Sequence, residues 1–455
     1  MARRAPNIVL IICHDLGQYC RCYGADAPTP HVDELAARGV LFSNYHCSAA
    51  QCSPSRGSIM TGRMPHTNGL AGLAHLGFGY HPGERTLAMY LAEAGYETVL
   101  FGMQHETTAD PATLGYSAVH GEPGRARDVM AKAAASLLSR GGDTARPFFY
   151  CVGTFEVHRP YHQAGYHHSD PVQVSVPPWL PDRPGIREDI AGLNGLVREL
   201  DGAVGLLSRA LEQSGLAEET LVVFTTDHGL AMPRAKGTCF DAGMKTALIV
   251  SQPGAVPCGR VDNSLLANCD LLPTLLELAG VEPPDHLNGR SFAGLLTGRA
   301  HEPRHDVLLE MTWHDLYNPM RAVKTANRKY IRSFARLPLV YLPKDIWQSP
   351  SGREVWPEYY AEARPEEELY DLETDPMEYR NVADDPAYAA DLARLRQRVL
   401  SEMDRTGDRL LQGPWPAPPR YIEAATGWSR SPSDREWFEQ ATNGDLACLM
   451  PRILR

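Results

Sequence analysis

Six consecutive apolar residues near the amino terminus, IVLIIC at positions 8–13, constrain the fold of this chain more than any other feature. A run this rich in β-branched residues is typical of a strand that is buried on both faces of a parallel sheet. Similar apolar runs alternate with amphipathic, helix-like segments at residues 86–102, 146–158, 195–229 and 246–280. This alternation predicts an α/β fold with a mostly parallel central sheet flanked by helices. In such folds ligands bind beyond the carboxyl ends of the strands.

The last third of the chain has a different pattern. Short strand-like runs separated by turns precede an acidic, turn-rich segment at residues 368–386 and a helical segment after it. We therefore expect a catalytic α/β domain over residues 1–300 and a smaller α+β domain over residues 301–455, with a Pro-rich tail from Gly413.

Composition excludes several classes of function. The 455 residues carry a formal net charge of -11, which argues against a nucleic-acid-binding protein. The ten cysteines match no zinc-binding spacing, so buried free thiols in a reducing compartment are expected. No apolar run approaches the ~18 residues of a membrane span, and no small-residue cleavage site follows the first apolar run. We expect a cytoplasmic protein with no membrane partner.

Two predicted strands end in paired histidine and aspartate residues. His14 and Asp15 follow the run at residues 8–13, and Asp227 and His228 follow the run at residues 220–226. If both strands belong to one parallel sheet, all four side chains lie at the same edge, where they form a plausible divalent-metal site. The alternative is that these residues only cap the turns that follow the strands.

The segment CSPSRGSIMTG, which begins at Cys52, has the features of a helix start. Pro54 suits a first helical turn and Gly62 suits a helix end. The free N–H groups and positive dipole end of such a helix favour a bound oxyanion, and Arg56 adds a fixed positive charge. A reactive thiol usually needs a histidine or redox partner, and no C-x-x-C motif stands here. The alternative is a buried thiol before an ordinary helix.

Together with PNIVLII, TPHVDELAARGVLFSNYHC, TDHG, KGT and ELYDLETDPMEYRNVA, the Cys-x-Pro-Ser-Arg segment resembles the signature of type I sulfatases. Within that family, CSPSRGSIMTGRMPHTNG and PMRAV most resemble the heparan N-sulfatase, or sulfamidase, branch. The resemblance implies an alkaline-phosphatase-like sandwich with a smaller carboxyl-terminal domain. It also implies that a separate formylglycine-generating enzyme oxidises Cys52 to Cα-formylglycine.

The resemblance further implies a mechanism. The formylglycine aldehyde hydrates, a metal lowers the pKa of one hydroxyl, and that hydroxyl attacks sulfur and expels an alcohol or amine. The second hydroxyl then expels sulfate and restores the aldehyde. The metal ligands implied are His14, Asp15, Asp227, His228 and modified Cys52. Ca²⁺ is the expected ion, with Mg²⁺ or Mn²⁺ as alternatives.

Four further residues match catalytic positions of the family. Arg56 orients the aldehyde hydrate, and His105 helps to eliminate sulfate. His158 contacts the sulfate and protonates the leaving group, and Lys236 assists it. Residues 65–81, His314 and Arg321 are expected to line the substrate pocket.

Two positions depart from the family pattern. His14 stands where the family usually has an aspartate, which removes one negative charge from the metal site and favours borderline ions over Ca²⁺. Met103 stands where sulfatases usually carry a lysine that bridges sulfate and nucleophile.

The sequence therefore predicts a sulfatase that acts on sulfate esters or sulfamates of a sugar or small organic molecule. A phosphonate monoester or phosphodiester hydrolase on the same scaffold remains an alternative, since such relatives also lack the lysine. A catalytically silent binding protein is a third possibility.

Overall fold

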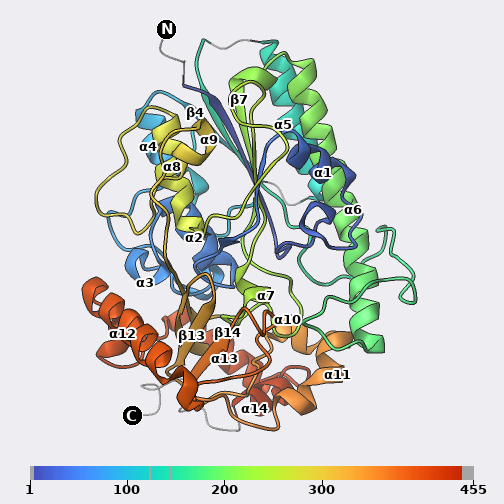
Figure 1. The fold of residues 1–455 in the computed structure, drawn as a ribbon. Helices are drawn as coiled ribbons and strands as arrows, with labels where there is room; N and C mark the ends of the chain where they lie inside the picture. The colour runs from blue at the N-terminus through green and yellow to red at the C-terminus, as the bar shows by residue number, and fades with distance from the viewer. Residues whose placement is uncertain (1–4, 122–123, 143–144, 443–455) are drawn as a thin grey trace.

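The computed structural model describes residues 5–121, 124–142 and 145–442 of the chain. A large sheet with helices on both faces lies next to a smaller sheet with its own helices (Figure 1). The large sheet has eight strands in the order β5-β4-β6-β1-β7-β8-β2-β9. Their bounds are β1 (Asn7–Cys13), β2 (Val40–Phe42), β4 (Glu97–Gly102), β5 (Ala118–His120), β6 (Phe148–Gly153), β7 (Thr220–Thr226), β8 (Leu248–Ser251) and β9 (Arg260–Asp262).

The apolar run near the amino terminus forms β1, in the interior of this sheet. β1 pairs in parallel with β6 on one side and with β7 on the other. Because side chains alternate along a strand, Ile8, Leu10 and Ile12 join one hydrophobic core, while Val9 and Ile11 join the other. β8 runs antiparallel to β7 and to β2, so the sheet is mostly, not wholly, parallel. The predicted α/β class is confirmed.

Helices cover both faces of the large sheet. Figure 1 shows α1, α5 and α6 on one face and α2, α4, α8 and α9 on the other. The long helix α6 packs on α5 and α1 through its apolar stripe. The bounds are α1 (Pro30–Ala37), α2 (Cys52–Thr61), α3 (Pro65–Asn68), α4 (Leu87–Glu93), α5 (Ala126–Arg140), α6 (Pro184–Gln213), α7 (Asp241–Met244), α8 (Leu271–Leu278) and α9 (Ala293–Thr297).

The smaller sheet is antiparallel, in the order β11-β12-β13-β14, and α12 packs on β12 and β13. Two helices, α13 and α14, follow the Pro-rich stretch, where the sequence predicted a tail. The division of the chain at residue 300 stays a prediction. The bounds are β11 (Val307–Trp313), β12 (Tyr317–Lys324), β13 (Arg328–Ser333), β14 (Glu367–Asp371), α10 (Lys344–Trp347), α11 (Pro350–Tyr359), α12 (Ala389–Thr406), α13 (Pro419–Arg430) and α14 (Arg435–Thr442).

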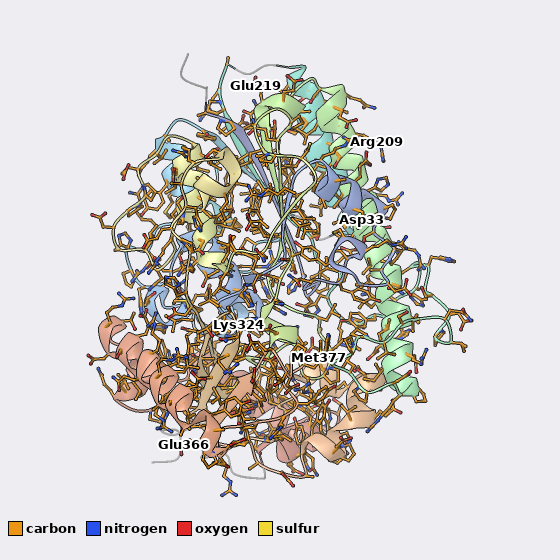
Figure 2. All side chains as sticks on the ribbon, in the orientation of Figure 1. Asp33, Arg209, Glu219, Lys324, Glu366 and Met377 are labelled. Atoms are coloured by element: carbon orange, nitrogen blue, oxygen red, sulfur yellow. The ribbon has the colours of Figure 1, made fainter. Side chains whose placement is uncertain are left out.

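The two sheets meet near the carboxyl ends of β1 and β7. Side chains fill the space between the layers, and Lys324 lies at the junction, whereas Glu219 lies at the far end of the large sheet (Figure 2). Lys324 and Lys329 from the smaller sheet both form ion pairs with Asp241 in α7. A two-stranded sheet of β3 (Tyr45–His46) and β10 (Leu266–Ala267) completes the strands. Across the described residues, we find no helix with both the length and the apolar character needed to cross a membrane.

Candidate active site

The two strand-end pairs predicted from the sequence lie side by side. In the register of β1 and β7, Cys13 is opposite Thr226, so the residues that follow each strand leave the sheet at one edge. The backbone N–H of Asp15 donates a hydrogen bond to Asp227 Oδ1 at 2.9 Å. Asp227 Oδ1 also accepts a hydrogen bond from the His228 backbone at 2.9 Å. These bonds fix the carboxylate of Asp227 toward the end of β1.

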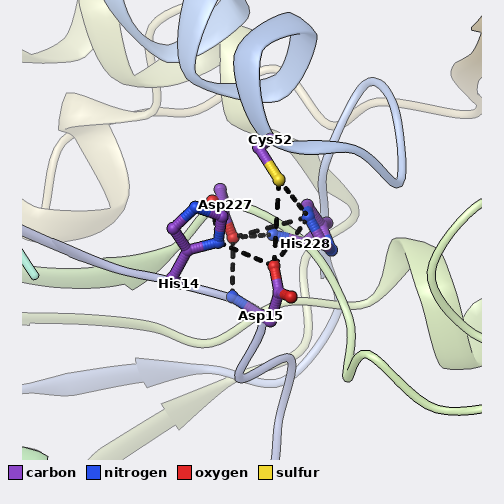
Figure 3. A group of neighbouring side chains, drawn as sticks. All are labelled: His14, Asp15, Cys52, Asp227 and His228. Atoms are coloured by element: carbon purple, nitrogen blue, oxygen red, sulfur yellow. Dashed lines mark hydrogen bonds and ion pairs between the residues drawn. The ribbon is translucent and has the colours of Figure 1, made fainter. Parts of the chain in front are cut away.

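Five potential ligand side chains converge at this edge, with ligand atoms all within 4.8 Å of one another (Figure 3). His14 Nδ1 lies 2.7 Å from Asp15 Oδ1 and 3.2 Å from Asp227 Oδ2. His228 Nε2 lies 3.0 Å from Asp15 Oδ1 and 3.4 Å from the Cys52 Sγ. The side chains that form this metal cluster are His14, Asp15, Cys52, Asp227 and His228, all buried.

The chemistry of these side chains fits a divalent cation. Two buried carboxylates beside two imidazoles need positive charge to offset the cost of leaving water. Burial alone lowers the pKa of His14, but Asp227 and the thiolate of Cys52 outweigh it and raise that pKa to about 9. Two negatively charged carboxylates thus lie against the His14 and His228 rings, at the position where a metal ion would add positive charge. Carboxylate oxygens and imidazole nitrogens are ligands of Mn²⁺, Mg²⁺ and other divalent ions.

Cys52 is the first residue of α2, and the helix ends at Gly62 with a φ of 66°, in the left-handed region that favours glycine. This start brings the thiol directly against the metal cluster. Burial raises the pKa of the Cys52 thiol, but the charges of His14 and Lys236 outweigh burial and hold that pKa well below its usual range.

Arg56 lies one turn into α2 and is also buried. Its Nε donates to Asp227 Oδ2 at 3.0 Å, and one terminal nitrogen donates to the carbonyl oxygens of Ile12 and Cys13, each at 3.4 Å. The guanidinium therefore ties the helix that carries Cys52 to the ends of β1 and β7.

Lys236 and His158 lie on the other side of Asp15. The Lys236 ammonium donates to Asp15 Oδ2 at 2.9 Å, to His158 Nε2 at 3.2 Å and to Asp345 Oδ2 at 3.0 Å. His158 Nδ1 lies 2.6 Å from the carbonyl oxygen of Arg159 and donates to it, so Nε2 accepts from the lysine. Burial and the Lys236 charge both lower the pKa of His158. In the contact between Lys236 and His158, the shared proton therefore lies on the Lys236 nitrogen.

His105 lies beside the cluster, with its ring centroid 5.5 Å from that of His14. Its φ of 69° turns the chain after β4 toward the site. The ring of His75, from the predicted pocket segment at residues 65–81, stacks on His105 at 5.7 Å with an interplanar angle of 11°.

Met103 lines a cavity of about 450 Å³ together with Arg125 and Phe155. Arg125 does not take the place of the missing lysine. Its guanidinium donates to the carbonyl oxygens of Gly165 and Ala164 and lies over the ring of Tyr166. At this position the chain has a thioether where the family pattern has an ammonium.

The two residues expected to bind substrate have different surroundings. His314 is buried and its Nδ1 lies 3.2 Å from the carboxylate of Asp315. Burial lowers the pKa of His314, but Asp315 outweighs it and raises that pKa to about 9. The structure does not bring Arg321 to the site. β12 is buried along its whole length, and the Arg321 guanidinium pairs with Asp408 at 2.5 Å inside the smaller part of the molecule.

Sequence reasoning missed Asp345, which lies in the short helix α10. Burial raises its pKa, but Lys236 and His158 outweigh burial and lower it below the usual range. Its neighbours in the sequence, LPKDIWQSP, form no catalytic motif, so no local signal could have identified it.

Comparison with known proteins agrees with this geometry. The Sulfatase family model matches residues 6–281, and the model for the carboxyl-terminal region of N-sulphoglucosamine sulphohydrolase matches residues 233–347. An ulvan-active sulfatase of Formosa agariphila is 26% identical over 89% of this chain and 75% of its own length. Human N-sulphoglucosamine sulphohydrolase is 28% identical over 91% of this chain and 92% of its own length.

The fold is also that of solved structures. A protein solved with its substrate D-glucosamine-2-N,6-O-disulfate matches with a TM-score of 0.68 and 19% identity, over 89% of this chain and 99% of its own. At that identity the likeness shows the fold alone.

Proposed function

This chain belongs to the sulfatase family, and we propose that it releases inorganic sulfate from sulfamates or sulfate esters of a sugar or small organic molecule. The observation that carries the proposal is the position of Cys52. It begins a helix, lies against a metal cluster, and is 3.4 Å from His228 Nε2. The sulfamidase branch is favoured because a sulphoglucosamine sulphohydrolase is similar along nearly its whole length.

We propose that residue 52 acts as Cα-formylglycine, made by a formylglycine-generating enzyme that reads Cys52, Pro54 and Arg56. A hydrated aldehyde at this position supplies a hydroxyl that attacks sulfur. Arg56 orients that hydroxyl, because its guanidinium is fixed between Asp227 and the carbonyl oxygens at the end of β1.

A divalent metal ion fits the cluster, held by His14, Asp15, Asp227, His228 and residue 52. When bound, such an ion lowers the pKa of a hydroxyl and stabilises negative charge that develops on oxygen. The family resemblance predicts Ca²⁺, which prefers oxygen ligands. The two imidazole nitrogens favour an ion that accepts nitrogen ligands more readily than Ca²⁺ does, such as Mn²⁺, and metal analysis of the purified protein decides between the two ions.

The remaining residues act on the sulfate and the leaving group. Lys236 and His158 hold a proton between them and pass it to the departing atom. His105 lies close to His14 and assists the release of sulfate. His314 is buried and interacts electrostatically with Cys52 and Lys236, and we propose that it contacts the substrate.

We further propose that residues 1–300 form the catalytic unit and residues 301–455 a smaller unit that contributes to the substrate side. A cytoplasmic location stays a prediction, which cell fractionation tests.

A substrate panel tests the proposed reaction. Protein made together with a maturing enzyme is assayed for sulfate release from an alkyl sulfamate, an alkyl sulfate and an aryl sulfate, with an aryl phosphonate alongside. We expect sulfate release, and loss of at least ~10⁴-fold in Cys52→Ala, because no nucleophile remains. Cys258→Ala, at an exposed cysteine, should keep full activity.

Two results would count against the proposal. Cys52→Ala with activity within tenfold of the unmodified sequence would show that residue 52 is not the nucleophile. Faster turnover of the phosphonate than of every sulfur compound would favour the phosphonate hydrolase alternative. That alternative arises because the chain has Met103 where sulfatases usually have a lysine.

A further inference from the structure

Asp345 adds a carboxylate next to Lys236 and His158, the pair proposed above to protonate the leaving group. The Lys236 ammonium lies between two carboxylates, at 2.9 Å from Asp15 Oδ2 and 3.0 Å from Asp345 Oδ2. The side chain of Asp15 is fully buried, whereas that of Asp345 is 23% exposed. Asp345 Oδ2 is also 3.9 Å from His158 Nε2. Asp345 therefore faces the accessible side of the proton-donating pair.

Other groups near Asp345 do not cancel its charge completely. Asp315 is already paired with His314 at 3.2 Å. Lys236 is shared with Asp15 at 2.9 Å, and His158 Nε2 lies farther from Asp345, at 3.9 Å. At position 103, where a lysine would add a positive charge, the chain carries methionine. The Lys236 ammonium is thus shared between two carboxylates, which leaves part of the Asp345 charge uncompensated.

This charge balance discriminates between two kinds of leaving group. An ester oxygen departs with developing negative charge, which a nearby carboxylate disfavours. A sulfamate nitrogen carries an N–H that can donate to a carboxylate, and it departs as an amine that becomes an ammonium ion. An ionised carboxylate accepts hydrogen bonds and cannot donate them, so it offers nothing to the bridging oxygen of an ester.

We propose that Asp345 is a specificity-determining residue that accepts a hydrogen bond from the departing nitrogen and makes the site selective for sulfamates over sulfate esters. This inference rests on the proposed function. In the step concerned, an oxygen of residue 52 bonds to sulfur as its proton passes to solvent. The S–N bond breaks with its electron pair going to nitrogen, and the proton held by Lys236 and His158 moves to that nitrogen. Asp345 stays ionised and stabilises the N–H groups that result.

The test compares two compounds that differ only in the bridging atom, cyclohexylsulfamate and cyclohexyl sulfate. We expect Asp345→Asn to lower kcat/KM for the sulfamate by about 10- to 100-fold, the usual worth of a hydrogen bond to a charged group. For the sulfate ester, kcat/KM should stay within about threefold of the unsubstituted protein's value or rise. The loss of the carboxylate removes its repulsion of the negative charge that develops on the ester oxygen.

Product binding gives a second readout that does not depend on turnover. Cyclohexylammonium should inhibit or bind the protein, and Asp345→Asn should weaken that binding about tenfold or more, with cyclohexanol binding unchanged. Asp345→Glu keeps the charge and should restore part of the selectivity. The matched control is Asp434→Asn, which removes a carboxylate paired with the neighbouring Lys344 at 2.8 Å. It should change neither the ratio of the two kcat/KM values nor the ratio of amine to alcohol binding.

The outcomes separate this inference from the proposed function. An equal loss on both compounds, with amine binding unchanged, would make Asp345 only a residue that positions Lys236 and would overturn the specificity role, while sulfate release still stands. Failure of the matured, unsubstituted protein to release sulfate from any compound would overturn the proposed function. That failure would be seen in the first assay, before any variant is compared. A selective loss on the sulfamate, with control and unfolding midpoint unchanged, supports the inference.

Discussion

The metal end of the candidate active site (His14, Asp15, Cys52, Asp227 and His228) comes from two adjacent strands and one helix. Its proposed leaving-group end (His158, Lys236 and Asp345) comes from three segments that are far apart in the sequence. The five residues of the metal end are at most 2% exposed, while the side chains of His158 and Asp345 are 21% and 23% exposed.

This difference in construction suggests a division of labour. In the proposed function, groups at the metal end act on the nucleophile and on sulfur, which are common to every substrate. In the same proposal, groups at the leaving-group end contact the atom that varies between substrates. Changes at the metal end should therefore reduce all activities together, and changes at the leaving-group end should alter the ratio between substrates.

Asp227→Asn should have the largest effect. The substitution removes a charged ligand of the metal cluster and the ion-pair partner of Arg56 at 3.0 Å. Because metal coordination contributes several kcal/mol to the stabilisation of developing charge, we expect kcat/KM to fall by about 10²–10³-fold. The fall should be similar for the alkyl sulfamate and the aryl sulfate, and bound metal per chain should drop in elemental analysis.

Asp285→Asn is the control for this substitution, at a residue outside the cluster. Full metal content in Asp227→Asn, or a loss confined to one substrate, would contradict the assignment of Asp227 to the metal end.

His158→Ala should affect substrates unequally. A poor leaving group needs a proton as it departs, and a good one such as p-nitrophenolate does not. General acid catalysis contributes about 10²–10⁴-fold, so we expect kcat/KM to fall by at least about 10²-fold for the alkyl sulfamate. For p-nitrophenyl sulfate the loss should stay below about tenfold.

The partly exposed His31 supplies the control, since His31→Ala removes an imidazole whose ion-pair partner is Glu34, outside the candidate site. Equal losses on both compounds in His158→Ala would mean that this residue positions sulfate and does not supply the proton.

Met103→Lys should produce a smaller change. The substitution restores the cation that the family pattern places beside sulfate, in a position next to Phe155 and the site. We expect the inhibition constant of inorganic sulfate to fall about three- to tenfold, in the range of a partly exposed charge-assisted hydrogen bond. Leu138→Lys, on the exposed part of α5, adds the same charge elsewhere and should leave the constant unchanged. Unchanged sulfate inhibition in Met103→Lys would show that position 103 does not face the anion.

Glu106→Gln should change stability and leave catalysis nearly unaltered. Burial raises the pKa of Glu106, next to His105, to about 8 from 4.5, and Tyr80 is its hydrogen-bond donor. Between these two values the folded protein keeps a proton that the unfolded chain releases, so the free energy of unfolding falls as pH rises. The loss is at most about 5 kcal/mol, at about 1.4 kcal/mol per pKa unit.

Urea unfolding at several pH values from 5 to 9 measures the slope of the free energy of unfolding against pH. Glu106→Gln should flatten it and be the more stable protein at pH 9, whereas Glu219→Gln, at an exposed position, should keep it. An unchanged slope in Glu106→Gln would mean that Glu106 is ionised throughout.

Much of the fold and the metal end could be predicted from local patterns. The apolar run at β1 predicts burial on both faces, because a strand with a polar face would alternate. Parallel pairing then brings the residues after β1 and β7 to one edge, so His14, Asp15, Asp227 and His228 follow from the strands themselves. Cys52 and Arg56 follow from the helix start and the family motif.

The leaving-group end could be predicted only in part. His158 and Lys236 were assigned through the resemblance to sulfatases, as was His105 beside the metal end, and Asp345 was not found. Arg321 was placed in the substrate pocket because it stands in a polar, aromatic segment. The structure instead pairs it with Asp408, which follows α12, since a strand buried along its length carries even a charged side chain inward when a partner is available.

The sequence by itself indicated the α/β class and the strand ends that carry His14, Asp15, Asp227 and His228, since hydrophobic periodicity is a local signal, and the family resemblance added Cys52. Only the tertiary structure decided the leaving-group end. The contact between Lys236 and Asp345 joins residues 109 positions apart, and it forms because the smaller sheet and α10 pack against the strand ends of the large sheet. No local pattern encodes how two such bodies meet, because that contact depends on the shape and charge of both surfaces.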